Sequence, residues 1–288
     1  QRRLRERVAL SFVCVVRFIL ENLTQYAGEI MSGNWDWQVF CTGTLTMETV
    51  PCCYGRGDEY TYLNWLVSAW GWTLAVSACA LVLALLAGIA VGVLRTLPAD
   101  RAGNRFWLLF AYAWVELFRN IPLLVQIFIW YFVLPVFIPA LKQVPSFVLV
   151  VCALGFFTSA RIAEQMRAGI QSLPRGQRHA AMALGMSTWQ TYRYVLIPTA
   201  VRIILPPLTS EAMNLVKNSA AAFAVSIAEL SQYAMQVQEE TSRSYEVYIA
   251  VTGLYMLSAF AVNRLFGFIE QRSRIPGLVV ANSTPGGR

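Results

Sequence analysis

The chain alternates between long apolar runs and short polar segments. An uncharged run covers residues 60–94, with its most apolar part at 70–94, and further apolar runs cover 121–141 and 143–160, the last continuing helically to Ile170. A helix needs about 20 apolar residues to cross the hydrocarbon core of a bilayer. The pattern therefore predicts transmembrane α-helices rather than the core of a soluble domain.

Two later runs are less regular. Residues 194–215 are apolar but include Arg202, Pro206, Pro207 and Glu211, which favours a broken or cavity-lining helix, because charges and irregular backbone at membrane depth must face protein or water. The last run covers 247–263 and 265–269 and ends in a basic tail. We therefore expect an all-α integral membrane protein with about five transmembrane helices.

Small residues recur through the first apolar run. They include Gly88 and Gly92, which form a GxxxG pair. Such residues permit close contact between helices in lipid, although this motif is weak evidence when it stands alone.

Composition supports the membrane assignment. Hydrophobic residues make up 57% of the 288 residues and charged residues only 14%, with a mean hydropathy of +0.50, whereas soluble domains carry roughly 25% charged residues. The net charge of +7 is therefore interpreted by its position along the chain, as a topology signal rather than a sign of nucleic-acid binding.

Basic residues concentrate in three of the loops and ends. These hold Arg95, Arg101, Arg105, Arg119, Arg161, Arg167, Arg175, Arg178, Arg193, Arg202, Arg264, Arg272, Arg274 and Arg288, whereas the other two loops hold only Lys142, Lys217 and Arg243. Because arginine and lysine accumulate in cytoplasmic loops, the pattern predicts an outside N-terminus and an inside C-terminus.

The N-terminal part divides into two segments. Residues 1–30 are arginine-rich with a short, interrupted apolar run; a poor signal peptide and a surface amphipathic helix are alternatives, but we expect an extension upstream of a natural start at Met31. Residues 31–68, rich in tryptophan and acids, suit the periplasmic side. A disulfide can form in this segment if the periplasm is oxidising, but the sequence does not decide its pairing, because Cys52 and Cys53 are adjacent and either could pair with Cys41.

The remaining chain is expected to form a transmembrane domain over 69–270 and a cytoplasmic tail over 271–288. Within the domain, residues 159–198 form an arginine-rich interruption with a single acid, Glu164. Its HAAMALG stretch combines good helix formers with small side chains, so a short helix can press a low-relief face into a partner, and Gly185 permits a reversal after it. The alternative is a merely solvated helix-turn-helix loop.

The segment HAAMALGMSTWQTYRYVLIP resembles the EAA loop of bacterial ABC importer permeases. Ala180, Ala181, Gly185 and Pro198 occupy the pattern's positions, whereas His179 replaces its glutamate. Val195 and Ile197 are mild departures. The stretches ELFRNIPLLVQ, AGIQSLPRGQRHAA and PPLTSEAMNLVKNSA resemble the polar amino-acid permeases, with the strongest similarity to glutamate/aspartate importers.

The resemblance implies an ABC type I importer permease fold in the bacterial inner membrane, working by alternating access. A coupling loop over 171–198 would dock on a separate ATP-binding subunit, present in two copies, which holds the ATP and Mg. Further partners would be a periplasmic amino-acid-binding protein and either a sister permease or a second copy of this chain. A pH-sensitive contact is conceivable at His179, the only histidine, but we expect a plain interface substitution.

Polar residues at membrane depth are candidates for a translocation path. Glu116 and Arg119 lie three residues apart on one helical face, a spacing that would allow them to pair. We expect them to fix the cytoplasmic entrance of the second span rather than to contact substrate. Gln126, Asn214, Lys217 and Asn218 would line a hydrophilic path, where the cationic Lys217 suits the second carboxylate of an acidic amino acid.

Other function classes lack the required motifs. The sequence contains no GxxxxGK[ST] phosphate loop, no HExxH and no GxSxG, so neither ATP hydrolysis nor familiar hydrolase chemistry is predicted. A secondary transporter or channel is the main alternative, but it often shows two repeated halves. An intramembrane enzyme is a third alternative, but the spacing of the serine, lysine and glutamate residues does not indicate a catalytic site.

Overall fold

The computed structural model describes residues 35–50, 53–54, 60–98 and 102–273, and its regular elements there are all helical. The predicted upstream extension over residues 1–30, the predicted start at Met31 and most of the predicted tail over 271–288 lie outside these residues. The elements are η1 (Trp37–Cys41), α2 (Tyr62–Leu94), α3 (Ala102–Asn120), α4 (Leu123–Phe128), η2 (Ile129–Val133), α5 (Leu134–Phe137), η3 (Pro139–Gln143), α6 (Ser146–Gln171), α7 (Arg175–Ala183), α8 (Thr188–Thr191), η4 (Tyr192–Leu196), α9 (Ile197–Asn218), η5 (Ser219–Val225), α10 (Leu230–Thr241) and α11 (Ser244–Ser273).

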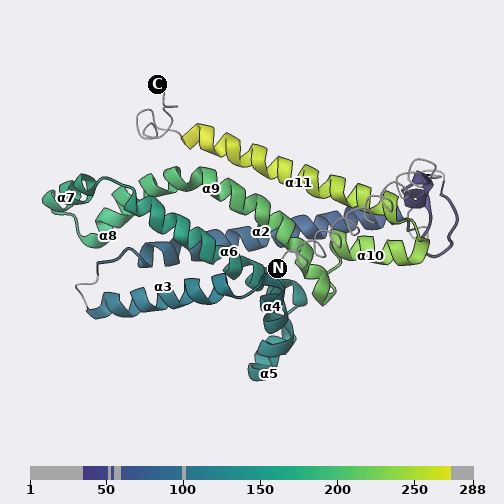
Figure 1. The fold of residues 1–288 in the computed structure, drawn as a ribbon, viewed down its shortest axis with the longest axis horizontal. Helices are drawn as coiled ribbons and strands as arrows, with labels where there is room; N and C mark the ends of the chain where they lie inside the picture. The colour runs from purple at the N-terminus through teal and green to yellow at the C-terminus, as the bar shows by residue number, and fades with distance from the viewer. Residues whose placement is uncertain (1–34, 51–52, 55–59, 99–101, 274–288) are drawn as a thin grey trace, which may run out of the picture.

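The long helices lie roughly side by side, with α2, α6 and α9 in the middle, α11 along one side and α3 along the other (Figure 1). One end of the molecule carries α7 and α8, and we call it the loop end. The other carries η1 and α10, and we call it the disulfide end. In the described part of the chain, four helical stretches are long and apolar enough to cross a membrane, or five with one bent pair, in agreement with the predicted number.

The centre of the fold is the contact between α2 and α6, the most extensive between any two elements. The predicted close-packing pair lies in it. A Cβ atom built on Gly88 would lie 2.7 Å from Ile162 Cβ, and one on Gly92 would lie 2.6 Å from Met166 Cβ. Because no side chain fits there, the two glycines allow the backbones to approach, and the GxxxG hypothesis is confirmed.

The second span differs from the prediction. In place of one helix over 121–141, α3 and the run from Leu123 to Phe137 meet at 108° across the break at Ile121 and Pro122. Gln126 closes the bend: its side-chain amide donates to the carbonyls of Phe118 (2.8 Å) and Ile121 (2.9 Å). These carbonyls lose helical partners at the break, so a buried glutamine supplies what lipid cannot.

The fourth span also differs from the prediction. Helix continues from Thr188 to Val225, and Pro206 and Pro207 lie inside α9 without ending it. The irregular parts are the π-helical η4 before α9 and the 3₁₀-helical η5 after it. Contacts of α9 with α6 and α11 support it on two sides. Neighbouring helices of this kind stabilise proline-containing spans.

A small folded cap covers the disulfide end. Cys41 pairs with Cys53, which resolves the doubtful pairing. The cap consists of the described residues between Trp35 and Thr61, and it is tied to α11 by the Asp36 N–H, which donates to Glu246 (2.9 Å). The hydroxyl of Tyr62, the first residue of α2, donates to Glu240 of α10 (2.8 Å). The cap, α10 and the start of α11 therefore form one packed unit.

Toward the loop end, one carboxylate joins three helices. Glu164 of α6 forms ion pairs with Arg95 at the end of α2, with Arg167 (3.0 Å) and with Arg119 of α3 (3.8 Å). The Arg95 side chain is 6% exposed and also lies over the ring of Tyr112. Glu164, the one acid of the arginine-rich segment, therefore compensates a nearly buried charge and links α2, α3 and α6.

The α2–α6 contact predicts a difference between two glycines of one helix. Gly92→Ala should destabilise the protein by about 1–3 kcal/mol, because the new methyl overlaps Met166 and the Ala163 carbonyl. Gly71→Ala is the matched control, since nothing lies within 4 Å of its Cβ position. Thermal unfolding in detergent measures both, and equal melting temperatures would contradict the packing described.

The charge cluster predicts a second difference. Glu164→Gln should cost about 2–3 kcal/mol of unfolding free energy, because Arg95 then remains buried without its counter-charge. Glu116→Gln should change stability by less than about 0.5 kcal/mol, since Glu116 is exposed. Denaturant titration of purified protein checks this, and similar losses in both variants would exclude a special role for Glu164.

Candidate functional site

The candidate site is the turn at the loop end, and α7 forms its first half. Its last residues form a Schellman motif: Met186 N–H donates to the Ala181 carbonyl (3.1 Å) and Gly185 N–H to the Met182 carbonyl (3.0 Å). Gly185 has φ +77°, a conformation that side-chain-bearing residues rarely adopt. The glycine therefore ends α7 and reverses the chain, as its position in the sequence predicted.

A second helix start follows immediately. The Ser187 hydroxyl accepts from Gln190 N–H, and the Gln190 side chain accepts from Ser187 N–H, forming a capping box that begins α8. Tyr192, in η4, then donates from its hydroxyl to the Thr96 carbonyl at the end of α2 (2.5 Å). Both sides of the turn are thus stabilised locally, and the turn is attached to the central helix.

The turn exposes an apolar surface. Leu184 is 80% exposed and Trp189 71%, and Met182 and Tyr194 are also exposed. We call these four residues with Ala180 the coupling surface. Arg175 of α7 and Arg193 of η4 are exposed as well, so the same elements also carry basic groups. Exposed apolar residues that form a contiguous patch are typical of surfaces that bind another protein.

The predicted loop residues fall into two groups. His179, Ala180, Gly185 and Pro198 are exposed. Ala181 is 4% exposed and is the buried residue of α7, a helix whose neighbours are α8 and η4. Ala181 therefore shapes the turn from inside, a position unsuited to direct contact with a partner.

The predicted pairing of Glu116 with Arg119 is wrong. Glu116 accepts a hydrogen bond from Asn120 (2.8 Å), and Arg119 reaches Glu164 on another helix. The spacing permitted the local pair, but tertiary packing offered Arg119 a carboxylate already shared by two other arginines.

The other path candidates lie on elements that contact one another. Gln126 is buried in α4, where its side chain bonds the carbonyls at the bend of the second span, and α4 packs against η5. Asn214, Lys217 and Asn218 lie at the end of α9, directly before η5. Lys217 is exposed there, and both asparagines are half-buried. The helix repeat puts these three side chains on one face.

Sequence reasoning missed a buried acid. Glu229 caps α10 by accepting from Gln232 N–H (3.0 Å), and it accepts from the Tyr255 hydroxyl (2.5 Å). Burial raises the pKa of its carboxyl, although these hydrogen bonds oppose the rise. Glu229 directly precedes the first residue of α10, and no recognisable sequence motif surrounds it, so only the fold reveals its burial. Over residues 35–273, outside the gaps, no three side chains are grouped as metal ligands.

Comparisons with known proteins agree with this architecture. Residues 84–275 match the family described as binding-protein-dependent transport system inner membrane component. The chain is 39% identical over 257 residues to the glutamate/aspartate import permease protein GltJ of Escherichia coli K12, covering 86% of this chain and 98% of that one. It is 30% identical to the glutamine transport system permease protein GlnP of the same organism, covering 70% and 90%.

Solved structures show the same fold. A chain from a crystal structure of an amino acid ABC transporter with histidines has a TM-score of 0.63 and 32% identity, covering 73% of this chain and 95% of that chain. An inward-facing MetNI methionine ABC transporter gives a TM-score of 0.62 at 23% identity, a likeness of fold alone, over 74% and 98%. The chain therefore belongs to the family of binding-protein-dependent transport system inner membrane components, the membrane-spanning permease subunits of ABC importers.

Proposed function

We propose that this chain is a permease subunit of an ATP-driven importer for glutamate and aspartate. The observation that carries the coupling half of the proposal is the exposed coupling surface on a turn whose own backbone is fully capped. The identity with the glutamate/aspartate permease supports the substrate. Transport proceeds by alternating access, and no catalytic residue is assigned to this chain.

The turn is mechanically suited to transmit movement. Helix continues from α8 through η4 into α9, so displacement of the coupling surface acts directly on a membrane span. The hydrogen bond from Tyr192 to the Thr96 carbonyl adds a connection to the end of α2. π-helical segments such as η4 frequently lie at functional sites. Closure of a docked ATPase would thus move α9 and α2 together.

The partners follow from this assignment. Two ATP-binding subunits would hold ATP and Mg and dock at the loop end, which is then cytoplasmic. A periplasmic amino-acid-binding protein would deliver substrate at the disulfide end, and a sister permease or a second copy of this chain would complete the path. The Cys41–Cys53 bridge supports an oxidising compartment at the disulfide end. These placements are consistent with the N-outside, C-inside orientation predicted from the basic residues.

Substrate passage is assigned to the face of α9 that carries Asn214, Lys217 and Asn218. An acidic amino acid has one carboxylate more than glutamine, and an exposed lysine provides a charge-assisted hydrogen bond to it. Glu116, Arg119 and Gln126 act at the bend of the second span and affect the path through its shape. A secondary transporter or channel would have no use for a docking turn at the loop end.

The coupling surface predicts loss of a partner without loss of the fold. Leu184→Glu should reduce co-purification of the ATP-binding subunit by at least about tenfold, because a charge replaces an apolar contact. Leu45→Glu is the matched control, since both leucines are 80% exposed and Leu45 lies in the loop closed by the Cys41–Cys53 disulfide. Membrane insertion should be normal in both. Full ATPase retention and uptake in the Leu184 variant would refute the docking assignment.

The path assignment predicts a charge-specific effect. Lys217→Ala should raise the half-saturating concentration for labelled glutamate uptake by about tenfold, because the second carboxylate of glutamate loses its cationic partner. Lys142→Ala, the same change at an exposed residue between two spans, should leave glutamate uptake unchanged. Unaltered glutamate uptake by an assembled Lys217 variant would remove this residue from the path.

A further inference from the structure

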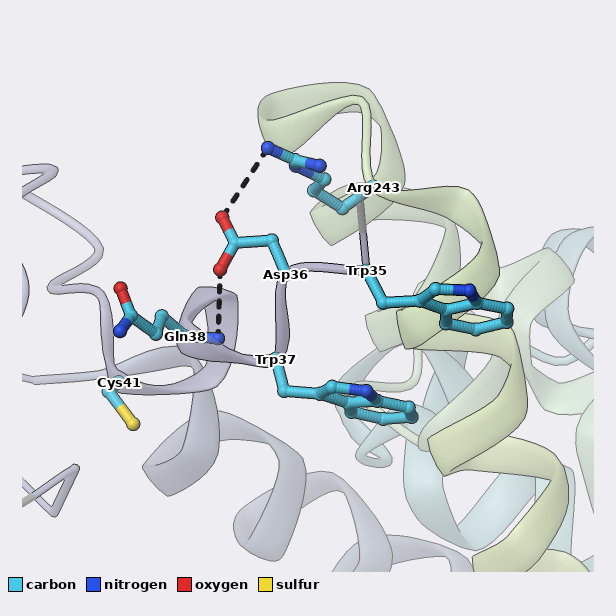
Figure 2. A pocket seen from close by; sticks show the side chains of 6 residues that line it. All are labelled: Trp35, Asp36, Trp37, Gln38, Cys41 and Arg243. Atoms are coloured by element: carbon cyan, nitrogen blue, oxygen red, sulfur yellow. Dashed lines mark hydrogen bonds and ion pairs between the residues drawn. The ribbon is translucent and has the colours of Figure 1, made fainter. Parts of the chain in front are cut away.

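The cap at the disulfide end contains an open hollow of about 770 Å³. It is lined by Trp35, Asp36, Trp37, Gln38, Cys41 and Arg243. Figure 2 shows the two indoles pointing to one side of the segment, and Asp36 and Gln38 to the other. The indole rings are stacked, with centroids 6.1 Å apart. The hollow thus combines flat aromatic faces with charged groups.

A second, apolar groove of about 540 Å³ runs along the first turns of α11, from Ser244 to Met256. Nothing lies within 4 Å of a Cβ position built on Gly253, so this residue leaves the groove open. The two hollows adjoin, because Arg243 directly precedes Ser244 and the rings of Trp35 and Tyr245 lie 6.5 Å apart.

We propose that the hollow and groove together bind one phospholipid with an amine-bearing, zwitterionic headgroup. The groove spans about 18 Å of helix, close to the roughly 15 Å thickness of one hydrocarbon leaflet. An acyl chain therefore fits along α11 while its headgroup remains at the cap. This inference requires only that α11 spans the bilayer, and is independent of the substrate and ATPase assignments.

The charges of the hollow match such a headgroup. Arg243 and Asp36 form an ion pair of 3.4 Å, and both side chains keep 41% of their surface exposed, so a ligand would add to contacts that these two groups already make. The guanidinium binds the phosphate, and the carboxylate binds the ammonium. An anionic headgroup lacking the amine would meet Asp36 unfavourably.

The surroundings favour lipid over a protein partner. The groove continues into the exposed apolar side of α11, which includes Leu257 and Phe260. This helix is a candidate span, and most of its apolar window is not covered by the rest of the chain. Exposed aromatic residues at its start, Tyr245 and Tyr248, are of the kind enriched at the headgroup level. A docking surface for a water-soluble protein would lie clear of this apolar side.

The test uses the complete transporter complex, stripped of lipid in detergent and titrated with phosphatidylethanolamine or phosphatidylglycerol, with bound lipid counted by native mass spectrometry. Arg243→Gln should weaken phosphatidylethanolamine binding about three- to tenfold by removing the phosphate contact. Gly253→Leu should produce a similar loss by filling the groove without changing any charge. Arg243→Lys should retain most of the binding.

Two controls lie at the other end of α11. Arg264→Gln and Gly267→Leu repeat the same changes where Arg264 lies over Phe260 and where Gly267 likewise has open space, and both should bind lipid normally. Unchanged phosphatidylethanolamine binding in Arg243→Gln and Gly253→Leu, or equal binding of both lipids by the unaltered complex, would overturn the proposal. Loss of the sister permease or of stimulation by the binding protein, with the lipid count unchanged, would assign this face to a protein and also overturn it.

Discussion

The close approach of α2 and α6 is the contact on which the rest of the structure depends. In lipid, apolar side chains gain little by leaving the solvent, so helices associate through fitted surfaces. Gly88 and Gly92 provide that fit, because each removes the side chain that would separate the two backbones. The remaining helices are arranged around this pair: α9 packs on α6, α11 on α9, and α3 on α6. Glu164 adds an electrostatic link where α2, α3 and α6 converge.

Departures from regular helix are each compensated. The 108° turn of the second span is closed by Gln126, which satisfies two carbonyls at the break. Pro206 and Pro207 remain inside a helix that neighbours support. Gly185 ends α7 with the backbone bonds of a Schellman motif. Local sequence causes the irregularity in each case. A side chain, a neighbouring helix or a backbone motif then stabilises the irregular backbone.

This arrangement gives the two ends of the molecule different properties. At the loop end, a rigid turn presents Leu184 and Trp189 outward and continues into α9, so force applied there reaches a span. At the disulfide end, a covalent bond closes the cap, a hydrogen bond joins it to α11, and another joins the start of α2 to α10. One end is therefore suited to transmitting motion, and the other to keeping a fixed surface.

Sequence alone determined that the chain lies in a membrane, that it is helical, how many spans it has and where the turn at the loop end falls. These follow from run length, charge and the spacing of Ala180, Ala181, Gly185 and Pro198, all of which act through local geometry or transfer into lipid. Only the tertiary structure decided that Ala181 is internal, that Arg119 binds Glu164 in place of Glu116, and that a bent pair forms the second span. The reason is physical: a helical period states which residues share a face, but burial and ion pairing depend on what another helix places opposite that face.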